Sequence, residues 1–417
     1  MVVVIGNVAR VAVELLLLSG KSVLLAGAPG TGKTRLGFET ARGFTGIDPL
    51  VVVGRGDMAA RELLYSYEPL DSGFRVVLGG LAVSVLASWA RLMAGLAPRW
   101  LLLDELNRMN AETVLGSLFT ALDLAHRLRV EVVPRWLVEK VLRDGGLLGE
   151  VADAAGLEKS QMREMLAVVL RRALDGAERV PGLPLPYSWR AIATMNMVDR
   201  SHLFRLGFAL LRRFPLVLVP GIGEEVAPSL DHSVLEDVER SVTSQERAVK
   251  IYRSIFEAMQ GELCRRAIEE LATDSSLTPF DKPIYAVGLD GGMVEEALEV
   301  FEGAVKTAAV FAARLGSLGV EVGPALLADV CRVVAVARLR GGVSEDVVAD
   351  IAVASLLLPQ LGAIAPAVKS ELLFGGEARR ARSVRRVLAL APRLLGEKSM
   401  SARYAEALSL ELPVQHV

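Results

Sequence analysis

The chain has 417 residues, 52% of them hydrophobic, and it carries a formal net charge of −2 with a pI near 6.2. This length accommodates two domains. The near-neutral charge excludes a global basic field of the kind that attracts nucleic acid, although it leaves a local patch open. Two cysteines far apart in the sequence, Cys264 and Cys331, predict neither a disulfide framework nor a metal site. The four histidines are scattered and form no ligand pattern.

The mean hydropathy of +0.39 is high enough that membrane segments have to be considered. The charge-free run 76–90 is short for a membrane span. The run 351–368 is interrupted by Pro359 and Pro366, and no Lys/Arg cluster flanks it. We therefore predict two buried helices and no membrane span. Because the apolar N-terminus leads directly into the first motif, we expect no signal peptide, and the natural prediction is a cytoplasmic protein.

A glycine-rich turn follows the first predicted strand, 21–26, and precedes a predicted helix, 34–43. The turn fits the phosphate-binding pattern G-x-x-x-x-G-K-[ST] with Gly27, Ala28, Pro29, Gly30, Thr31, Gly32, Lys33 and Thr34. Its glycines let successive backbone N–H groups face a phosphate, and the positive end of the following helix points at the same anion. We expect Lys33 to reach the β- and γ-phosphates and the Thr34 hydroxyl to ligate Mg²⁺.

Two later strands end in polar residues that suit hydrolysis. Four apolar residues at 100–103 are followed directly by Asp104 and Glu105. Asp104 is expected to hold the Mg²⁺ shell, and Glu105 to polarise the attacking water beside the γ-phosphate. A strand within 188–200 ends in Asn196, whose amide is expected to orient the same water. The alternative for Asn196 is an ordinary polar residue at a strand end.

Strands and helices alternate over residues 1–220. The expected strands are 21–26, 49–53, 100–103, 188–196 and 215–220, and the expected helices include 7–19, 34–43 and 109–125. This alternation predicts an α/β fold with an open parallel sheet of five strands, whose ligand lies at the carboxyl edge of the strands.

The segment 57–98 interrupts this alternation. It is predicted to be mostly helical but broken, with a small β-hairpin over 73–81 that is marked by alternation and by Gly79-Gly80.

A second insertion, about 128–182, is rich in helical signals, and residues 151–165 match the spacing of a helix-turn-helix. In that arrangement a DNA groove would be faced by Lys159, Gln161 and Arg163. The same segment also carries acidic residues that would repel phosphate, namely Asp153, Glu158 and Glu164. A plain helical hairpin packed against the rest of the molecule is the favoured interpretation.

Helical periodicity dominates from residue 221 onward. An all-α domain is predicted over 221–375, with helices at 244–273, 292–315, 325–340 and 344–361. An Arg-rich helical tail follows over 376–417. Its arginines form either a solvated helix face, which is favoured, or a partner site.

The ordered motifs GAPGTGKT, LLLDELNR, IATMN and ALLRRF resemble those of the AAA+ NTPases. The phrases DELNRMN and TMNMVDRS look like one branch of that superfamily, which includes the MoxR-type chaperone ATPases, the McrB-type restriction motors, midasin and dynein. The resemblance covers residues 7–220 with specific motifs and the helical domain only in shape. It implies a P-loop NTPase core of the AAA+ type followed by an all-α lid domain.

The resemblance also implies a role for each matching residue. Lys33 and Thr34 would be the phosphate and Mg²⁺ residues, and Asp104 and Glu105 the metal and water residues. Asn196 would be the first sensor of the γ-phosphate.

An arginine that completes the site of a neighbouring subunit is implied as well. Arg213 matches that finger best, and Arg212 is the alternative; a finger in trans requires a ring, for which a hexamer is expected. One position departs from the family pattern, because Ala325 stands where a second-sensor arginine would begin a lid helix. Arg332 could substitute only if that helix docked differently, so the second sensor is not assigned.

Three functions fit these observations. The first is an ATP-driven remodeller of a protein partner, of the MoxR kind, with Mg²⁺ as cofactor. The second is a McrB-like motor, using ATP or GTP, that drives a nuclease on DNA; the phrase TMNMVDRS favours it, and the absence of a basic field disfavours it. The third is a nucleotide-binding scaffold without turnover, which would need neither Glu105 nor Asn196.

The residues that would contact the nucleotide base have no clear signature in the sequence. A turn at Ile5, Gly6 and Asn7 is our hypothesis for them.

Overall fold

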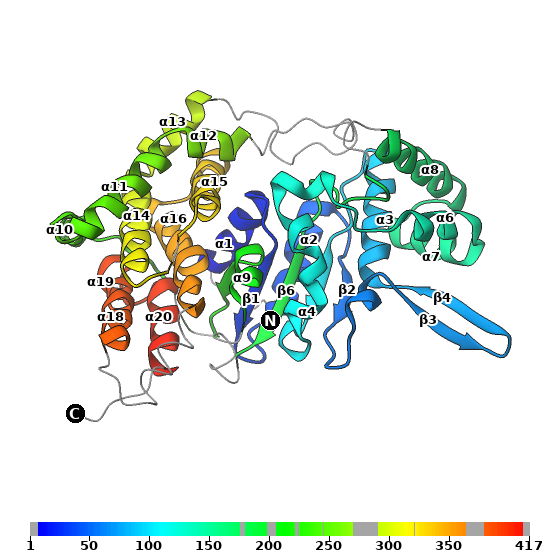
Figure 1. Ribbon diagram of the computed structural model, residues 1–417, viewed down its shortest axis with the longest axis horizontal. Coiled ribbons are helices and arrows are strands. Elements are labelled where there is room, and N and C mark those ends of the chain that lie inside the picture. Colours follow the sequence, from blue (N-terminus) through cyan, green and yellow to red (C-terminus); the bar gives the residue numbers. More distant parts are fainter. Residues whose placement is uncertain are drawn as a thin grey trace.

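The computed structural model describes residues 7–175, 180–197, 206–221, 224, 226–244, 246–269, 291–320, 322–363 and 379–411. The chain forms an α/β core and a helical region that lies beside it (Figure 1). Among the described residues, no helix has the length and apolar character that crossing a membrane requires.

The core is built on one parallel sheet with the strand order β2-β5-β6-β1-β7. Its strands are β1 (Val23–Gly27), β2 (Leu50–Val53), β5 (Leu101–Asp104), β6 (Ala191–Asn196) and β7 (Leu216–Leu218). All four neighbouring pairs are parallel, which confirms the predicted five-stranded sheet. The interior strand β1, which lies between β6 and β7, is buried along its whole length, as the run VLLAG requires.

The register brings the polar strand ends to one edge. Gly27 at the end of β1 lies opposite Asn196 of β6, and Val53 of β2 lies opposite Asp104 of β5. Helix α2 (Lys33–Thr45) begins directly after the glycine-rich turn, while α1 (Asn7–Leu18) precedes β1. The predicted carboxyl edge therefore gathers the phosphate loop, the acidic pair and Asn196.

The inserted hairpin differs from its prediction. Strand β3 (Tyr65–Leu70) pairs with β4 (Gly73–Leu78), so the hairpin turns after Leu70 and not at Gly79-Gly80. The two glycines lead into helix α3 (Gly80–Met93). A Cβ on Gly79 would lie 2.2 Å from the Glu62 carbonyl oxygen, and one on Gly80 would lie 2.4 Å from Val52 Cγ2. Close packing, and not a turn, requires this glycine pair.

The hairpin projects from the core (Figure 1). Its exposed apolar side chains are Tyr67, Leu70 and Phe74, and Phe74 is 74% exposed. The preceding turn of 3₁₀ helix covers Ala60–Leu63.

The segment predicted as one helix over 109–125 is broken into short turns. They are α4 (Ala111–Leu115), a 3₁₀ turn (Gly116–Leu118), α5 (Phe119–Leu122) and a second 3₁₀ turn (Leu124–Arg129). Gly116 stands at the first break, where its low helix propensity lets the α-helical pattern end.

The second insertion consists of α6 (Arg135–Arg143), α7 (Gly145–Ala155) and α8 (Lys159–Asp175). Gly156, with a φ of 66°, turns the chain between α7 and α8, and both helices pack on α3. The side chains of Lys159, Gln161 and Arg163 are exposed. This geometry is that of a packed helical hairpin, and a DNA-binding role for it stays a prediction.

The helical region occupies the rest of the chain. Its helices are α10 (His232–Thr243), α11 (Glu246–Gln260), α12 (Glu262–Glu269), α13 (Gly291–Val300), α14 (Glu302–Ser317), α15 (Pro324–Arg340) and α16 (Glu345–Ile351), with a π turn (Ala352–Leu357) and a 3₁₀ turn (Leu358–Ala363) after it. The sequence analysis missed α10, whose N-cap is Asp231; its carboxylate accepts a hydrogen bond from the Val234 N–H at 3.0 Å.

The two cysteines, for which the sequence predicted no disulfide framework, are joined to each other. Cys264 of α12 and Cys331 of α15 form a disulfide, with their Cα atoms 5.3 Å apart. The two residues are separated by 67 positions in the sequence. Sequence distance gave no information here, because α12 and α15 pack side by side.

A buried charge cluster joins the core to the helical region. The Lys21 ammonium, before β1, contacts the Asp329 carboxylate of α15, and Asp329 also pairs with Arg332 at 2.7 Å. Burial lowers the pKa of Lys21, although the neighbouring Asp329 opposes this shift. Lys21 also donates to the Arg212 carbonyl at 3.3 Å. Removing Asp329 would leave two buried cations without their shared partner, so this contact holds α15 on the core.

The Arg-rich segment ends in helices that pack on the rest of the molecule. They are α18 (Arg379–Leu388), α19 (Leu390–Leu395) and α20 (Met400–Glu411). The buried Asp350 carboxylate at the end of α16 accepts hydrogen bonds from the Met400 and Ser401 N–H groups, both at 2.8 Å, and from the Ser401 hydroxyl at 2.5 Å. Asp350 therefore caps α20 from another helix.

This cap predicts an unusual pH dependence. Burial raises the pKa of Asp350 from 3.8 to about 6, against the opposing effect of its three donors. Because the pKa is raised in the folded state, the contribution of Asp350 to the free energy of unfolding is greatest below its unfolded-state pKa of 3.8. This contribution is lost as the pH rises through about 6. Asp350→Asn does not titrate, so the free energy of unfolding of the wild type minus that of this variant should fall by roughly 3 kcal/mol between pH 4 and pH 7. Urea unfolding at several pH values measures it; a difference that grows with pH would contradict the assignment.

Candidate nucleotide site

The phosphate-binding loop joins β1 to α2, and each glycine in it has a steric reason. Gly30 and Gly32 have φ values of 79° and 84°, which L side chains rarely adopt. A Cβ on Gly27 would lie 2.6 Å from the Val219 carbonyl oxygen. The sequence therefore folds into the strand–turn–helix arrangement that the motif requires.

Lys33, the first residue of α2, is 6% exposed. Its ammonium donates hydrogen bonds to the Ala28 carbonyl at 2.6 Å and to the Gly27 carbonyl at 3.1 Å. Burial lowers the pKa of Lys33, while the nearby Asp104 acts in the opposite direction. A cation is thus held inside the loop, where a phosphate would compete with the carbonyl oxygens for it.

Asp104 at the end of β5 is the centre of a hydrogen-bond cluster. Its Oδ1 atom accepts from the Thr34 hydroxyl at 2.9 Å and from the Thr194 hydroxyl at 2.5 Å. Thr194 Oγ1 in turn accepts from the Glu105 N–H at 3.1 Å. One buried threonine on β6 therefore positions both members of the acidic pair.

The role of Thr194 was not predicted from the sequence. The available signal was a hydroxyl in the apolar strand AIATMN, two positions before Asn196. Thr194 is 2% exposed, and a buried hydroxyl needs a hydrogen-bond partner. Its partner could be identified only when β5 and β6 were placed side by side.

Glu105 has a φ of 55°, and no other non-glycine residue in the described ranges has a positive φ. Such a conformation is strained and persists where surrounding contacts impose it. Gly54 supplies one contact, because its N–H donates to the Asp104 carbonyl at 2.8 Å and a Cβ there would lie 2.5 Å from the Glu105 carbonyl oxygen. The Glu105 carboxylate forms an ion pair with Arg108, and its side chain is 25% exposed.

Asn196 ends β6 beside the loop. It is half-buried and lies opposite Gly27, and the next residue, Met197, donates its N–H to the Gly27 carbonyl at 3.0 Å. The structure thus brings Asn196 to the loop that carries Lys33.

The residues at this edge fit a magnesium ion. Thr34 and Asp104 present a hydroxyl and a carboxylate oxygen to each other, and Mg²⁺ prefers hard oxygen ligands. Within the part of the chain that the structure describes, no group of three His, Cys, Asp or Glu residues could hold a metal. A site with one carboxylate suits Mg²⁺ because this ion usually keeps several waters and takes phosphate oxygens as ligands.

The two arginines proposed for a neighbouring site end α9 (Phe208–Arg213). The Arg213 guanidinium lies 5.3 Å from the centre of the Phe119 ring, and its Nε donates to the Phe119 carbonyl at 3.1 Å. Arg212 pairs with Asp123 at 3.1 Å. Both side chains are thus fixed by α5 and the turn after it.

The second-sensor position lies on α15. Ala325 is exposed in the first turn of this helix. Arg332 is 6% exposed and donates to the Asp329 carboxylate at 2.7 Å and to the Ala267 carbonyl at 2.9 Å. Arg332 is therefore used in packing α15 on α12.

A cavity of about 250 Å³ adjoins the phosphate loop. Gly27, Ala28 and Met197 line one side, and Arg403 and Glu406 of α20 line another. Glu224 also lines it and pairs with Arg403 at 2.6 Å. No pattern in the sequence predicted that α20 would lie here. The predicted base-contacting turn begins with Ile5 and Gly6, which lie outside the described residues.

A phosphate loop at the end of β1, with an acidic pair on β5 and a polar residue ending β6, defines a P-loop nucleotide-binding fold. Residues 22–214, a little under half of the chain, match the family described as "AAA domain (dynein-related subfamily)". This part of the chain is therefore similar to the AAA domains of that subfamily. The match does not distinguish the MoxR-type from the McrB-type branch.

One solved structure with similarity is described as "a putative ATPase" from Cytophaga hutchinsonii ATCC 33406. Its sequence is 16% identical, the alignment covers 75% of this chain and 76% of that chain, and the TM-score is 0.27. At this TM-score we draw no conclusion from the similarity. No curated protein matches the chain.

The position of Thr194 leads to a prediction. Thr194→Val keeps the shape of the side chain but removes the hydroxyl that bonds to Asp104 and Glu105. We expect nucleotide turnover to fall by about 10- to 100-fold, the usual effect of losing a residue that orients metal and catalytic groups. Phosphate release measures it, and Thr194→Ser should restore much of the rate.

A matched control is Thr307→Val on α14, which removes a buried hydroxyl that donates to the Gly303 carbonyl at 2.7 Å, in the helical region. Its turnover should equal that of the wild type. Unchanged turnover in Thr194→Val would show that this threonine does not position the acidic pair.

Proposed function

We propose that the chain is a Mg²⁺-dependent ATPase. The observation that carries the proposal is the shared contact of Thr34, Asp104, Thr194 and Glu105 directly beside the phosphate loop. The loop N–H groups and Lys33 would bind the phosphates, and Thr34 and Asp104 would hold Mg²⁺, which neutralises charge on the phosphate oxygens.

Glu105 and Asn196 would act on the water. A carboxylate beside the γ-phosphate can accept a proton from the attacking water, and an amide can orient it. The imposed backbone of Glu105 supports this role, since strained residues cluster at functional sites. A scaffold that only binds nucleotide would need no such residue, which argues against the third function.

The cavity between the loop and α20 is our candidate site for the nucleoside. It adjoins Gly27 and Ala28, so a nucleotide whose phosphates enter the loop can extend into it. Its polar groups belong to Glu224, Arg403 and Glu406. Since these residues come from the linker after β7 and from the last helix, bound nucleotide would join the core to the helical region.

Assembly into a ring, with a hexamer as the expected form, is the second part of the proposal. Arg213 would enter the site of the adjacent subunit, with Arg212 as the alternative. The Phe119 contacts support this role, because a finger must be held rigidly to stabilise charge on the transferred phosphoryl group.

An unknown protein is the proposed partner, which the ring would remodel. The hairpin β3–β4 supports this part, because its exposed apolar side chains can contact another protein. The alternative is a McrB-like NTPase, with GTP as a further substrate, that acts with a nuclease on DNA.

A cytoplasmic location is also part of the proposal. Disulfides are rare in cytoplasmic proteins, but they are common in those of heat-adapted organisms. The disulfide between Cys264 and Cys331 therefore fits a cytoplasmic location best if the protein comes from such an organism.

The choice of nucleotide tests the first part. The wild type should release phosphate from ATP faster than from GTP, and Glu105→Gln should slow ATP turnover by about 100-fold or more, since it cannot accept a proton. Glu257→Gln, at an exposed position of α11, is the control and should leave the rate unchanged. A clear preference for GTP would favour the McrB-like alternative, and equal rates for wild type and Glu105→Gln would refute the catalytic role of Glu105.

A mixing experiment tests the ring. Arg213→Ala and Lys33→Ala should each be almost inactive, and the turnover rate of Arg213→Ala should fall by about 10³-fold. An equal mixture should recover roughly a quarter of the wild-type rate, because one random interface in four joins an intact loop to an intact Arg213. Arg212→Ala should lose less activity than Arg213→Ala. Full activity of Arg213→Ala, or no recovery in the mixture, would contradict a finger in trans.

A further inference from the structure

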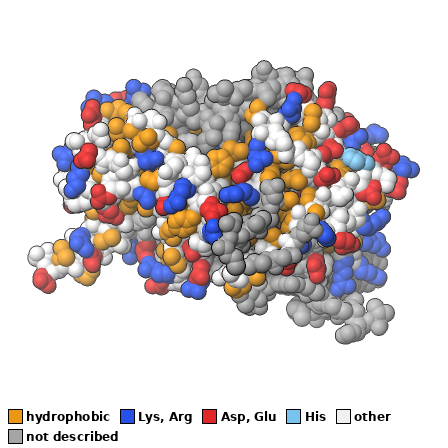
Figure 2. All heavy atoms as spheres, turned by 180° about the vertical axis from the view of Figure 1, so that it is seen from behind, with side chains coloured by type: hydrophobic (Ala, Val, Ile, Leu, Met, Phe, Trp, Pro, Cys, Tyr) orange, Lys and Arg blue, Asp and Glu red, His pale blue; other side chains and the backbone are white. Residues whose placement is uncertain are grey.

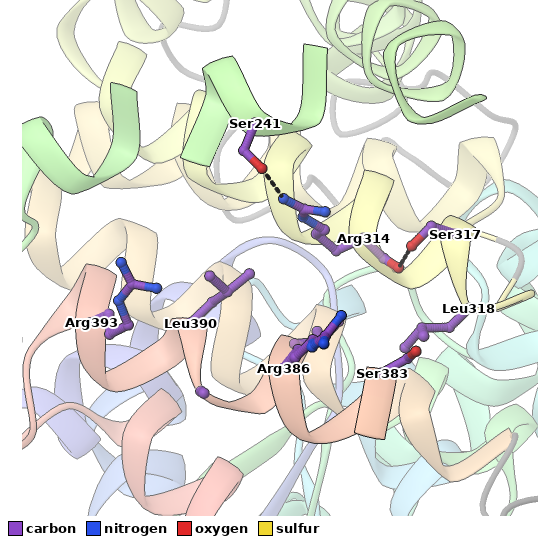
Figure 3. A pocket seen from close by; sticks show the side chains of 10 residues that line it. Ser241, Arg314, Ser317, Leu318, Ser383, Arg386, Leu390 and Arg393 are labelled. Atoms are coloured by element: carbon purple, nitrogen blue, oxygen red, sulfur yellow. Dashed lines mark hydrogen bonds between the residues drawn. The ribbon is translucent and has the colours of Figure 1, made fainter. Parts of the chain in front are cut away.

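A second cavity lies in the helical region, between α14 and the pair α18–α19 (Figure 3). Its volume is about 500 Å³. The polar side chains that line it are Ser241, Arg314, Ser317, Ser383, Arg386 and Arg393. Figure 3 shows Arg314 on one wall and Arg386 and Arg393 on the facing helices, so cations from separate elements surround the same space.

The charge of this cavity is uncompensated within the described part of the chain. No Asp or Glu is among its lining residues there, and no carboxylate pairs with Arg314, Arg386 or Arg393. Arg314 donates to the Ser241 hydroxyl at 3.0 Å, which is a neutral partner. Its Nε is buried without a hydrogen-bond partner among the described residues. Burial also lowers the pKa of Arg314, and no anion there opposes this shift.

Two buried arginines elsewhere in the chain have partners that satisfy their guanidinium groups. Arg127 is fully buried, and its guanidinium donates to carbonyl oxygens that include those of Leu122 at 2.8 Å and Tyr187 at 3.0 Å. Arg332 has Asp329. Like-charged guanidinium groups that share a cavity repel each other, and an anion between them would relieve this repulsion.

We propose that this cavity binds a small polyphosphate, a ligand that carries at least two linked phosphoryl groups. Three guanidinium groups match such a ligand because each can hold phosphate oxygens through two parallel N–H bonds. One phosphate dianion would leave positive charge uncompensated. The volume is in the range of small-molecule sites, which favours a compact ligand over a long strand.

A nucleic-acid backbone is the competing ligand. Figure 2 shows Lys and Arg side chains gathered in the part of the molecule that holds α18 and α19, and the charged residues of α18 include Arg382 outside the cavity. The net charge of −2 shows that this patch is local. A bound strand would need an extended basic track, whereas the cavity is bounded by two layers of helices.

The test uses inorganic tripolyphosphate and isothermal titration calorimetry on the full chain. Lys33→Ala is the background, so that the probe cannot use the lysine of the phosphate loop. We expect one bound tripolyphosphate per chain. Adding Arg386→Gln should weaken binding by about tenfold or more, as expected for the loss of a charge-assisted contact.

The matched control is Arg382→Gln, which removes the same charge from an exposed position on the same helix. It should leave the affinity unchanged. Arg314→Gln should also weaken binding, and its melting temperature shows whether the fold is retained. Because Arg386 and Arg393 are exposed, substituting either residue should not disturb the fold.

Four outcomes would overturn the proposal. They are no binding in the Lys33→Ala background, equal losses in Arg382→Gln and Arg386→Gln, equal affinity for orthophosphate and tripolyphosphate, and displacement of the probe by single-stranded DNA with a steep salt dependence. The last result would assign the patch to nucleic acid. Since none of these measurements depends on turnover, failure here leaves the proposed ATPase untouched.

Discussion

The Asp104 carboxylate is the contact on which the nucleotide site depends. It lies where β5 ends, and it accepts hydrogen bonds from the Thr34 hydroxyl at the start of α2 and from the Thr194 hydroxyl on β6. These two hydrogen bonds join the phosphate loop, the acidic pair and the neighbouring strand. The parallel register makes them possible, because it brings the carboxyl ends of three strands to one edge.

A buried ion pair joins the helical region to this core, because Asp329 of α15 contacts Lys21, just before β1. Within the helical region, Asp350 joins α16 to the start of α20. Helix α20 in turn reaches the cavity beside the phosphate loop through Arg403. A ligand in that cavity would touch both regions, and domain closure around a nucleotide is a common way to transmit its state.

Arginine serves two purposes in this chain. Where the guanidinium is satisfied by carbonyl oxygens or by a carboxylate, as at Arg127 and Arg332, it stabilises packing. Where it faces a cavity without an anion, as at Arg386, it is available to a ligand. The difference cannot be read from composition, since the residue type is the same.

The fold of the core could be predicted from the sequence. The motif 27–34, the apolar strands and the positions of Asp104, Glu105 and Asn196 predicted a five-stranded parallel sheet and its binding edge, because period and spacing encode local structure. Features that depend on contacts between distant segments became visible only in the folded chain. The hydrogen bonds of Thr194, the turn of the hairpin before Gly79-Gly80, the disulfide between Cys264 and Cys331, and the arginine cavity all join residues from separate elements. A pattern along the chain cannot specify which of its helices and strands will lie side by side.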